Sequence, residues 1–178
     1  GPALSVTQAR AMFRMGTLLE ASIDDLITTM NQQLAKDLAA NRFITAFLGS
    51  LDAHTHQLRF HSAGQGPLLL FRASTKSWQS LPATTIPLGI TKSLPSESAS
   101  SIELQPGDIF AILSDGFFEF PNSQGELFGQ ERVAAVILRH QKQELPTILE
   151  KLQQAIIQFA GGVLQPDDMT ALMIKCTA

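Results

Sequence analysis

The order in which hydrophobic patterns follow one another along the chain limits its fold more than any other feature. Apolar residues recur at helical spacing in two stretches near the start and two near the end, and short β-rich apolar segments lie between them. The predicted helices cover residues 3–19, 23–40, 129–140 and 144–160. A closing strand is predicted over 169–175. Helix pairs that bracket a block of antiparallel-type strands predict an α+β fold, with helices packed on the sheet faces.

Local signals refine this prediction. Ser22 is a residue type favoured at helix N-caps, and Asp24 and Asp25 follow it in the first turn, where the helix dipole favours negative charge. Residues 84–100 are rich in Pro, Ser and Thr, which predicts a surface loop or flap. Residues 109–113 are wholly apolar, which predicts a buried strand.

A hairpin is predicted in the first half of the strand block. Residues 43–48 form a β-rich apolar segment, and a turn is expected at 52–55. Along the returning strand, 58–62, the polar residues Arg59 and His61 alternate with Leu58, Phe60 and Ser62. This alternation predicts that one face of the hairpin is buried and that the other faces solvent.

Composition excludes several classes of protein. The 178 residues suit one domain, and 44% hydrophobic against 16% charged residues can build a core. A net charge of −3 argues against nucleic-acid binding, which needs a basic face. The one cysteine, Cys176, cannot form an internal disulfide or a zinc cluster. No apolar run approaches the roughly 20 residues that span a bilayer, and no signal-peptide pattern opens the chain. We therefore expect a cytoplasmic location, without membrane or nucleic acid as partners.

Three carboxylates stand where a metal ion could be bound. Asp115 follows the apolar segment 109–113, and Gly116 allows the backbone to turn sharply beside it. Asp167 and Asp168 precede the closing strand, and a cation or solvent would relieve their mutual repulsion. If the three converge, oxygen ligands without His or Cys select Mg²⁺ or Mn²⁺, ions that favour phosphate chemistry. The alternative is that Asp115 caps a turn and that Asp167 and Asp168 form a solvated one.

Other common sites are absent from the sequence. It contains no Gly-rich phosphate loop, no dinucleotide-binding Gly-x-Gly-x-x-Gly and no Gly-x-Ser-x-Gly nucleophile turn. The four histidines have no metal-ligand spacing. We therefore expect each histidine to be structural or exposed to solvent.

Six segments carry motifs that are specific when taken together and in this order. They are 62–70 (Ser-Ala-Gly-Gln-Gly-Pro-Leu-Leu-Leu), 88–90 (Leu-Gly-Ile), 104–108 (Leu-Gln-Pro-Gly-Asp), 114–119 (Ser-Asp-Gly-Phe-Phe-Glu), 122–132 (Asn-Ser-Gln-Gly-Glu-Leu-Phe-Gly-Gln-Glu-Arg) and 167–170 (Asp-Asp-Met-Thr). In these segments the chain resembles the bacterial SpoIIE/RsbU-type serine phosphatases, a branch of the PP2C-like (PPM) metal-dependent protein phosphatases.

The resemblance implies a PP2C-like α/β/β/α sandwich, two antiparallel sheets flanked by helix pairs, with residues 1–178 in a single domain. It implies hydrolysis of phosphoserine or phosphothreonine on a small regulatory protein, typically a STAS-type anti-sigma-factor antagonist, by water that Mn²⁺ or Mg²⁺ activates. Asp115 and Asp167 would be metal ligands, and Asp168 a further ligand or the group that orients Asp167. Gly116 would allow close packing beside the metal.

The sequence departs from the family pattern at two places. Gln65 stands where relatives usually carry His. In the family, roughly fifty residues precede this part, including an Asp-x-Ser-Gly-His-Gly segment whose aspartate bridges two metals. We therefore expect the N-terminal part of the domain to be missing from this sequence and the two-ion site to be empty or incomplete.

Three explanations of the missing segment are open: a leading segment that is disordered, a shortened chain, or a natural variant without catalysis. A sheet without its inner strands leaves backbone groups unpaired. Unpaired backbone groups in the core would lower the stability of the fold. We therefore favour the first explanation, a leading segment that is disordered, or a partner chain that fills the gap.

Three functions follow from these patterns. The first is a metal-dependent protein serine/threonine phosphatase, in the cytoplasm or as the cytosolic output domain of a larger sensor protein. The second is a non-catalytic PP2C-fold module that binds a regulator. The third is another Mg²⁺ enzyme of phosphate esters, such as a nuclease, which the acidic charge balance disfavours. We favour the phosphatase, and a homodimer is compatible with it.

Overall fold

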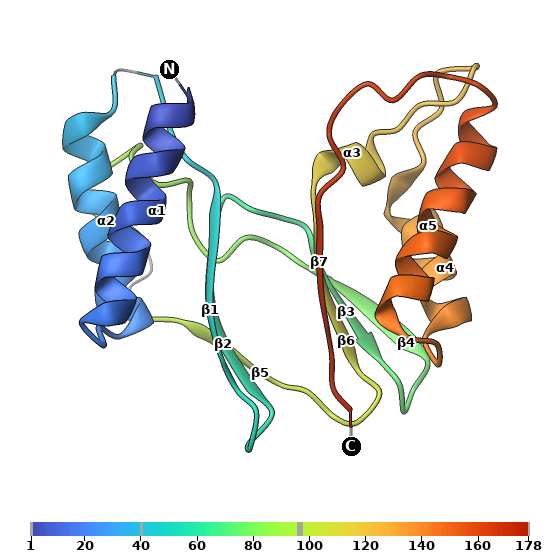
Figure 1. The fold of residues 1–178 in the computed structure, drawn as a ribbon, viewed down its shortest axis with the longest axis horizontal. Helices are drawn as coiled ribbons and strands as arrows, with labels where there is room; N and C mark the ends of the chain where they lie inside the picture. Colours follow the sequence, from blue (N-terminus) through green and yellow to red (C-terminus); the bar gives the residue numbers. More distant parts are fainter. Residues whose placement is uncertain (1, 40, 96–97, 178) are drawn as a thin grey trace. The chain divides into compact units, whose positions relative to one another are not determined.

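The computed structural model describes residues 2–39, 41–95 and 98–177. They form two compact units, which we call unit 1 (Gly1–Gln65 and Ala83–Glu103) and unit 2 (Gly66–Pro82 and Leu104–Ala178). Each unit contains one antiparallel sheet and a pair of long helices on one face of that sheet (Figure 1). The predicted α+β class is therefore confirmed. No helix of the described residues is long and apolar enough to span a membrane.

Unit 1 combines two helices with a three-stranded sheet. Its elements are α1 (Pro2–Leu18), α2 (Ile23–Asp37), β1 (Ala46–Asp52), β2 (Gln57–Ala63) and β5 (Ser100–Glu103). The strand order is β1-β2-β5, and both neighbouring pairs are antiparallel. Helix α2 packs on β1 and β2, and α1 packs on α2 (Figure 1).

Helix α2 begins where the sequence predicts. The Ser22 hydroxyl accepts a hydrogen bond from the backbone N–H of Asp25 at 3.1 Å, which confirms Ser22 as the N-cap. Buried residues recur along one face of the helix and form much of the core of unit 1: Leu26, Ile27, Met30 and Leu34. The helix ends at Asp37, three residues before the predicted end at Ala40, which lies outside the described residues.

The predicted hairpin is present as β1 and β2, but β1 runs from Ala46 to Asp52 rather than over 43–48. The Asp52 carboxylate accepts hydrogen bonds from the backbone N–H groups of His54 and Thr55, which fixes the turn and lowers the pKa of Asp52. On β2 the alternation holds only at the start, because His61 is fully buried beside Phe60.

The segment predicted as a surface loop over 84–100 is instead partly built into the core of unit 1. Leu88 is fully buried, Leu94 is buried, and Leu88 exchanges two backbone hydrogen bonds with Ile44. The Asn31 side chain accepts a hydrogen bond from the Gly89 N–H at 2.9 Å and donates one to the Thr91 carbonyl at 2.9 Å. Residues 96 and 97 of the predicted loop lie outside the described residues.

Unit 2 contains the second sheet, whose strand order is β4-β3-β6-β7 with antiparallel pairing throughout. Its strands are β3 (Leu68–Arg72), β4 (Ser77–Leu81), β6 (Ile109–Leu113) and β7 (Ala171–Lys175). Its helices are the one-turn α3 (Asp115–Phe118), α4 (Gly129–His140) and α5 (Leu145–Ala160). The strand β6 and the helix α4 have the predicted bounds, whereas α3 was not predicted.

The core of unit 2 lies between α4, α5 and one face of the sheet. Apolar side chains at helical spacing on α5, such as Ile148, Leu152 and Ile156, are fully buried there. Helix α5 ends at Ala160, as predicted, and Gly161 after it adopts the left-handed conformation with φ of 58°. Trp78, the only tryptophan, is half-buried on β4 and packs against this core.

The Leu-x-Pro-Gly-Asp segment before β6 is a structural turn. The fully buried Asp108 carboxylate forms an ion pair with Arg72 at 2.6 Å and accepts hydrogen bonds from the backbone N–H groups of Ala73 and Gln105. These donors compensate the buried charge of Asp108, which without partners would destabilise the fold. Gly107 occupies the turn position with φ of 89°, which an L side chain rarely adopts.

Candidate active site

Two acidic segments reach the same end of the unit 2 sheet. Asp115 follows β6 as the first residue of α3, and Asp167 and Asp168 precede β7. Strands β6 and β7 are antiparallel neighbours, and Leu113 at the end of β6 lies opposite Ala171 at the start of β7. The end of one strand and the start of the other therefore bring the two acidic segments side by side.

Hydrogen bonds extend this pairing beyond the strands. The Ser114 N–H donates to the Thr170 carbonyl at 2.9 Å. The Ser114 hydroxyl donates to the Asp168 carbonyl at 3.1 Å and accepts from the Thr170 N–H at 2.9 Å. Three hydrogen bonds thus hold the residue before Asp115 against the segment that carries Asp168.

Gly116 makes the closest approach between the two segments. A Cβ atom at this position would lie 2.5 Å from the carbonyl oxygen of Asp168 and 3.2 Å from its carbonyl carbon. Gly116 is buried, and it lies within α3 rather than at the sharp turn expected from the sequence. The position requires glycine because any side chain would push the backbone of Asp168 away.

The three carboxylates themselves face solvent. Asp115, Asp167 and Asp168 are all exposed, and one oxygen of Asp167 accepts a hydrogen bond from the N–H of Asp168 at 2.7 Å. Among the described residues, the carboxylates of Asp115 and Asp168 have no hydrogen-bond or ion-pair partner. Such unpaired oxygens are available to an external cation or to water.

The donor set fits a hard cation in kind. It offers carboxylate oxygens without nitrogen or sulfur, the set preferred by Mg²⁺ and Mn²⁺. However, within residues 2–39, 41–95 and 98–177 no group of three or more His, Cys, Asp or Glu side chains is arranged to hold a metal ion. An ion bound by these aspartates would therefore need side-chain rotation and further ligands such as water.

Side chains of the 122–132 motif form hydrogen bonds within the loop after α3 and between this loop and α4. The Asn122 side-chain oxygen, Oδ1, accepts hydrogen bonds from the backbone N–H groups of Gln124 and Glu126. Arg132 on α4 donates to the carbonyls of Leu127 and Phe128, forms an ion pair with Glu126, and lies 4.7 Å from the ring centre of Phe159. The residues of the 122–132 motif therefore stabilise this loop.

Sequence reasoning missed a second carboxylate cluster, which lies in unit 1. The Asp24 carboxylate pairs with His61 Nε2 at 2.7 Å and Arg59 Nη2 at 3.0 Å, and it accepts from the Ala99 N–H at 2.8 Å. Partial burial alone would raise the pKa of Asp24, but the hydrogen bonds from His61 and Ala99 and the nearby positive charges outweigh it, so the pKa is lowered. No local pattern links these residues, which are up to 75 positions apart.

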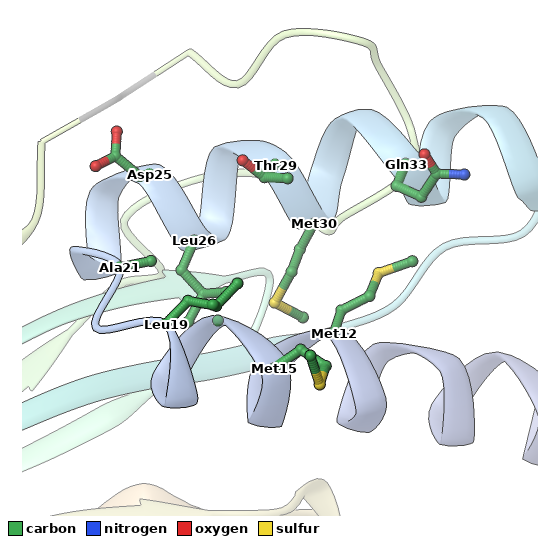
Figure 2. A pocket seen from close by; sticks show the side chains of 10 residues that line it. Met12, Met15, Leu19, Ala21, Asp25, Leu26, Thr29, Met30 and Gln33 are labelled. Atoms are coloured by element: carbon green, nitrogen blue, oxygen red, sulfur yellow. The ribbon is translucent and has the colours of Figure 1, made fainter.

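Unit 1 also contains an apolar groove of about 410 Å³ between α1 and α2. Figure 2 shows side chains from both helices around it, including Met12 and Met15 from α1 and Leu26 and Met30 from α2. Asp25 is the only ionisable residue of its lining. This composition suits apolar contact and offers no set of groups for phosphate chemistry, so we place the candidate active site at the acidic segments of unit 2.

Comparisons with known proteins agree with these features. The family model of stage II sporulation protein E (SpoIIE) matches residues 1–177. Phosphoserine phosphatase RsbU of Bacillus subtilis is 22% identical over 165 residues, which cover 92% of this chain and 48% of that protein. Stage II sporulation protein E of the same organism is 26% identical over 161 residues, which cover 89% of this chain and 19% of that protein. The chain thus spans about half or less of these relatives.

Solved structures have the same fold. The SiaA-PP2C domain of Pseudomonas aeruginosa superposes with a TM-score of 0.80 at 24% identity, over 97% of this chain and 69% of that one. The RsbU and RsbW domains of a Mycobacterium tuberculosis protein give a TM-score of 0.76 at 21% identity, over 99% of this chain and 48% of that one. These similarities confirm the predicted PP2C-like fold.

Proposed function

Because the chain belongs to the SpoIIE family, we propose that it hydrolyses phosphoserine or phosphothreonine on a protein, using a divalent metal site to which Asp115, Asp167 and Asp168 contribute. The observation that carries the proposal is the hydrogen-bonded contact between the segments of Asp115 and Asp168. It joins two segments, distant in the sequence, that each carry an unpaired carboxylate. The name of the relative RsbU, phosphoserine phosphatase, supports the reaction class.

Each residue has a proposed part in this chemistry. Asp115 and Asp167 would supply anionic oxygens to the metal, and Asp168 would be a further ligand or would orient Asp167. Divalent ions bound there would polarise the phosphoryl oxygens and activate water for attack. Gly116 keeps the two acidic segments close, because it has no side chain to separate them. Mn²⁺ and Mg²⁺ both suit the oxygen donors.

The substrate and setting are further parts of the proposal. We infer a small phosphorylated regulatory protein with a STAS fold as the substrate, on the basis of the family. Residues 1–178 would act as one domain, in the cytoplasm or as the cytosolic part of a larger sensor protein. A homodimer is compatible with this arrangement.

A non-catalytic PP2C-fold module that binds a regulator is the second candidate. It is favoured by one observation: the carboxylates of the described residues do not form a three-ligand group. Such a module would keep the fold and the contact between segments but would not bind a divalent ion tightly.

Titration calorimetry with Mn²⁺ and a phosphate-release assay on a phosphoserine protein test the proposal together. We expect Mn²⁺ binding and Mn²⁺-dependent phosphate release, both strongly reduced in Asp115→Ala. Glu150→Gln, which removes an exposed charge from α5, is the matched control and should behave as the wild type. Absence of Mn²⁺ uptake by the wild type would favour the non-catalytic module.

A further inference from the structure

Ser114 has an unusual role for a serine at the start of a helix. It occupies the N-cap position of α3, where a serine side chain ordinarily accepts a hydrogen bond from its own helix. Here its side chain makes no capping hydrogen bond. The hydroxyl is instead used on the segment before β7, as donor to Asp168 and acceptor from Thr170.

This hydroxyl is placed where the sheet no longer fixes the backbone. The regular pairing of β6 with β7 ends at Leu113 and Ala171, so both acidic segments lie beyond it. The Ser114 N–H still reaches the Thr170 carbonyl, but only the hydroxyl reaches Asp168 itself. The side chain of Ser114 therefore adds the last connection before the carboxylates.

The Asp168 carbonyl is contacted by two residues, Ser114 and Gly116. Its oxygen accepts the Ser114 hydroxyl proton at 3.1 Å and leaves no room for a Cβ atom on Gly116. Glycine permits the close approach, and the serine hydroxyl supplies an attraction that maintains it. Without that attraction, the repulsion between the negative charges of the two segments would favour separation of the segments.

We propose that Ser114 is a positioning residue that holds Asp115 in register with Asp167 and Asp168 for divalent-metal binding, an inference that rests on the proposed function. Ser114 does not touch the metal in this proposal. It acts through the backbone of the Asp168 segment, as the outer groups of metal sites act by fixing the orientation of the ligands. Loss of such a group typically weakens metal affinity by about 10–100-fold.

The test compares Mn²⁺ affinity by titration calorimetry in the wild type, Ser114→Ala and Ser114→Thr. We expect affinity to fall by about 10–100-fold in Ser114→Ala and to be largely restored in Ser114→Thr, which keeps the hydroxyl. Ser80→Ala is the matched control, since it removes another serine hydrogen bond of unit 2, to Gln130, and should leave affinity unchanged. Amide hydrogen exchange at Thr170 should accelerate in Ser114→Ala alone, because that N–H loses its acceptor.

The outcomes separate this inference from the proposed function. A wild type that binds no Mn²⁺ overturns the metal-dependent function and, with it, this role of Ser114. A wild type that binds Mn²⁺ as tightly as Ser114→Ala overturns the positioning role alone. Equal loss in Ser114→Ala and Ser114→Thr would also overturn it. If Ser114→Ala does not fold, Ser114→Cys, with a similar volume and a weak donor, takes its place.

Discussion

Two sets of aspartates, Asp24 in unit 1 and the pair Asp115 and Asp168 in unit 2, have opposite surroundings. In unit 1, Asp24 binds two side chains of β2 and the N–H of Ala99, the residue before β5, and these partners outweigh the effect of partial burial and lower its pKa. In unit 2, Asp115 and Asp168 have carboxylates without a partner among the described residues, although the backbone around them is tightly held. Around Asp24 the protein binds the carboxylate itself, whereas around Asp115 and Asp168 it binds only the backbone that carries the carboxylates.

This difference separates stability from ligand binding. A carboxylate whose hydrogen bonds are made within the protein stabilises the fold and has little left for an external ion. An exposed carboxylate without partners contributes little to stability, and it keeps its oxygens for a ligand. Removal of the Asp24 carboxylate and removal of an exposed carboxylate of the acidic segments should therefore change different measured quantities.

The largest effect is expected for Asp167→Asn in unit 2. Mn²⁺ affinity and phosphate release should fall by about 100-fold or more, because a proposed direct ligand loses its charge. Loss of a group that only orients the ligands can already weaken metal affinity by about 100-fold. The free energy of unfolding should change by less than about 0.5 kcal/mol, as for other exposed positions. Calorimetric titration and urea denaturation measure the two quantities. A large loss of stability in this variant would break the comparison.

Gly116→Ala should be the most destabilising substitution. Its Cβ would meet the backbone oxygen of Asp168 at 2.5 Å, and backbone cannot move aside as a side chain can. We expect a loss of about 3 kcal/mol, the upper part of the range for overpacked sites, together with weaker Mn²⁺ binding. Gly16→Ala in α1 is the control: its Cβ would meet only the end of the flexible Leu26 side chain, and alanine favours helix. Equal destabilisation by both variants would contradict the assigned contact.

In unit 1, Asp24→Ala should lower stability without changing Mn²⁺ affinity. The substitution leaves the buried His61 without its partner, and we expect a loss of about 1–2 kcal/mol. Urea denaturation and Mn²⁺ titration of the same samples check both parts. Reduced Mn²⁺ affinity would show that the Asp24 cluster also serves the metal site.

The contribution of Asp24 should also depend on pH. Its pKa is lower in the folded than in the unfolded chain, so the stabilisation is complete above pH about 4 and is lost as the pH falls through the folded-state pKa. The difference in unfolding free energy between wild type and Asp24→Ala should therefore shrink on acidification. A difference that stays constant between pH 3 and 7 would contradict this account.

Arg59→Ala should have the smallest effect. Arg59 is half exposed, and its ion pair with Asp24 lies near solvent. Such pairs contribute less than about 1 kcal/mol, and salt screens them. Urea denaturation at low and high salt should show a small loss at low salt that diminishes at high salt. A loss as large as that in Asp24→Ala would mean that Arg59, rather than His61, dominates the cluster.

Local patterns in the sequence predicted those helices and strands whose position depends on neighbouring residues alone. The apolar run of β6, the amphipathic stripe of α4 and the N-cap at Ser22 each follow from neighbouring residues, and the structure confirms them. The likeness to the family also placed the aspartates of interest, although their roles stay predictions. The structure adds that β6 and β7 bring the two acidic segments together.

The remaining features depend on contacts between distant residues. Alternation along β2 predicts an exposed His61, but Asp24, 37 positions away, offers a partner that permits burial. The composition of residues 84–100 predicts a surface loop, but Ile44 and Asn31 provide hydrogen bonds that bring this segment into the core. The need for Gly116 appears only once Asp168 lies beside it. None of these partners is visible in a sequence window.

The position of Trp78 has a practical consequence. The chain contains no tyrosine, so this single indole on β4 dominates its near-ultraviolet emission. Because the indole packs against the core of unit 2, its fluorescence should report the unfolding of unit 2 and not that of unit 1. Comparing this signal with circular dichroism, to which the helices of both units contribute, would reveal whether the units melt in one step or two.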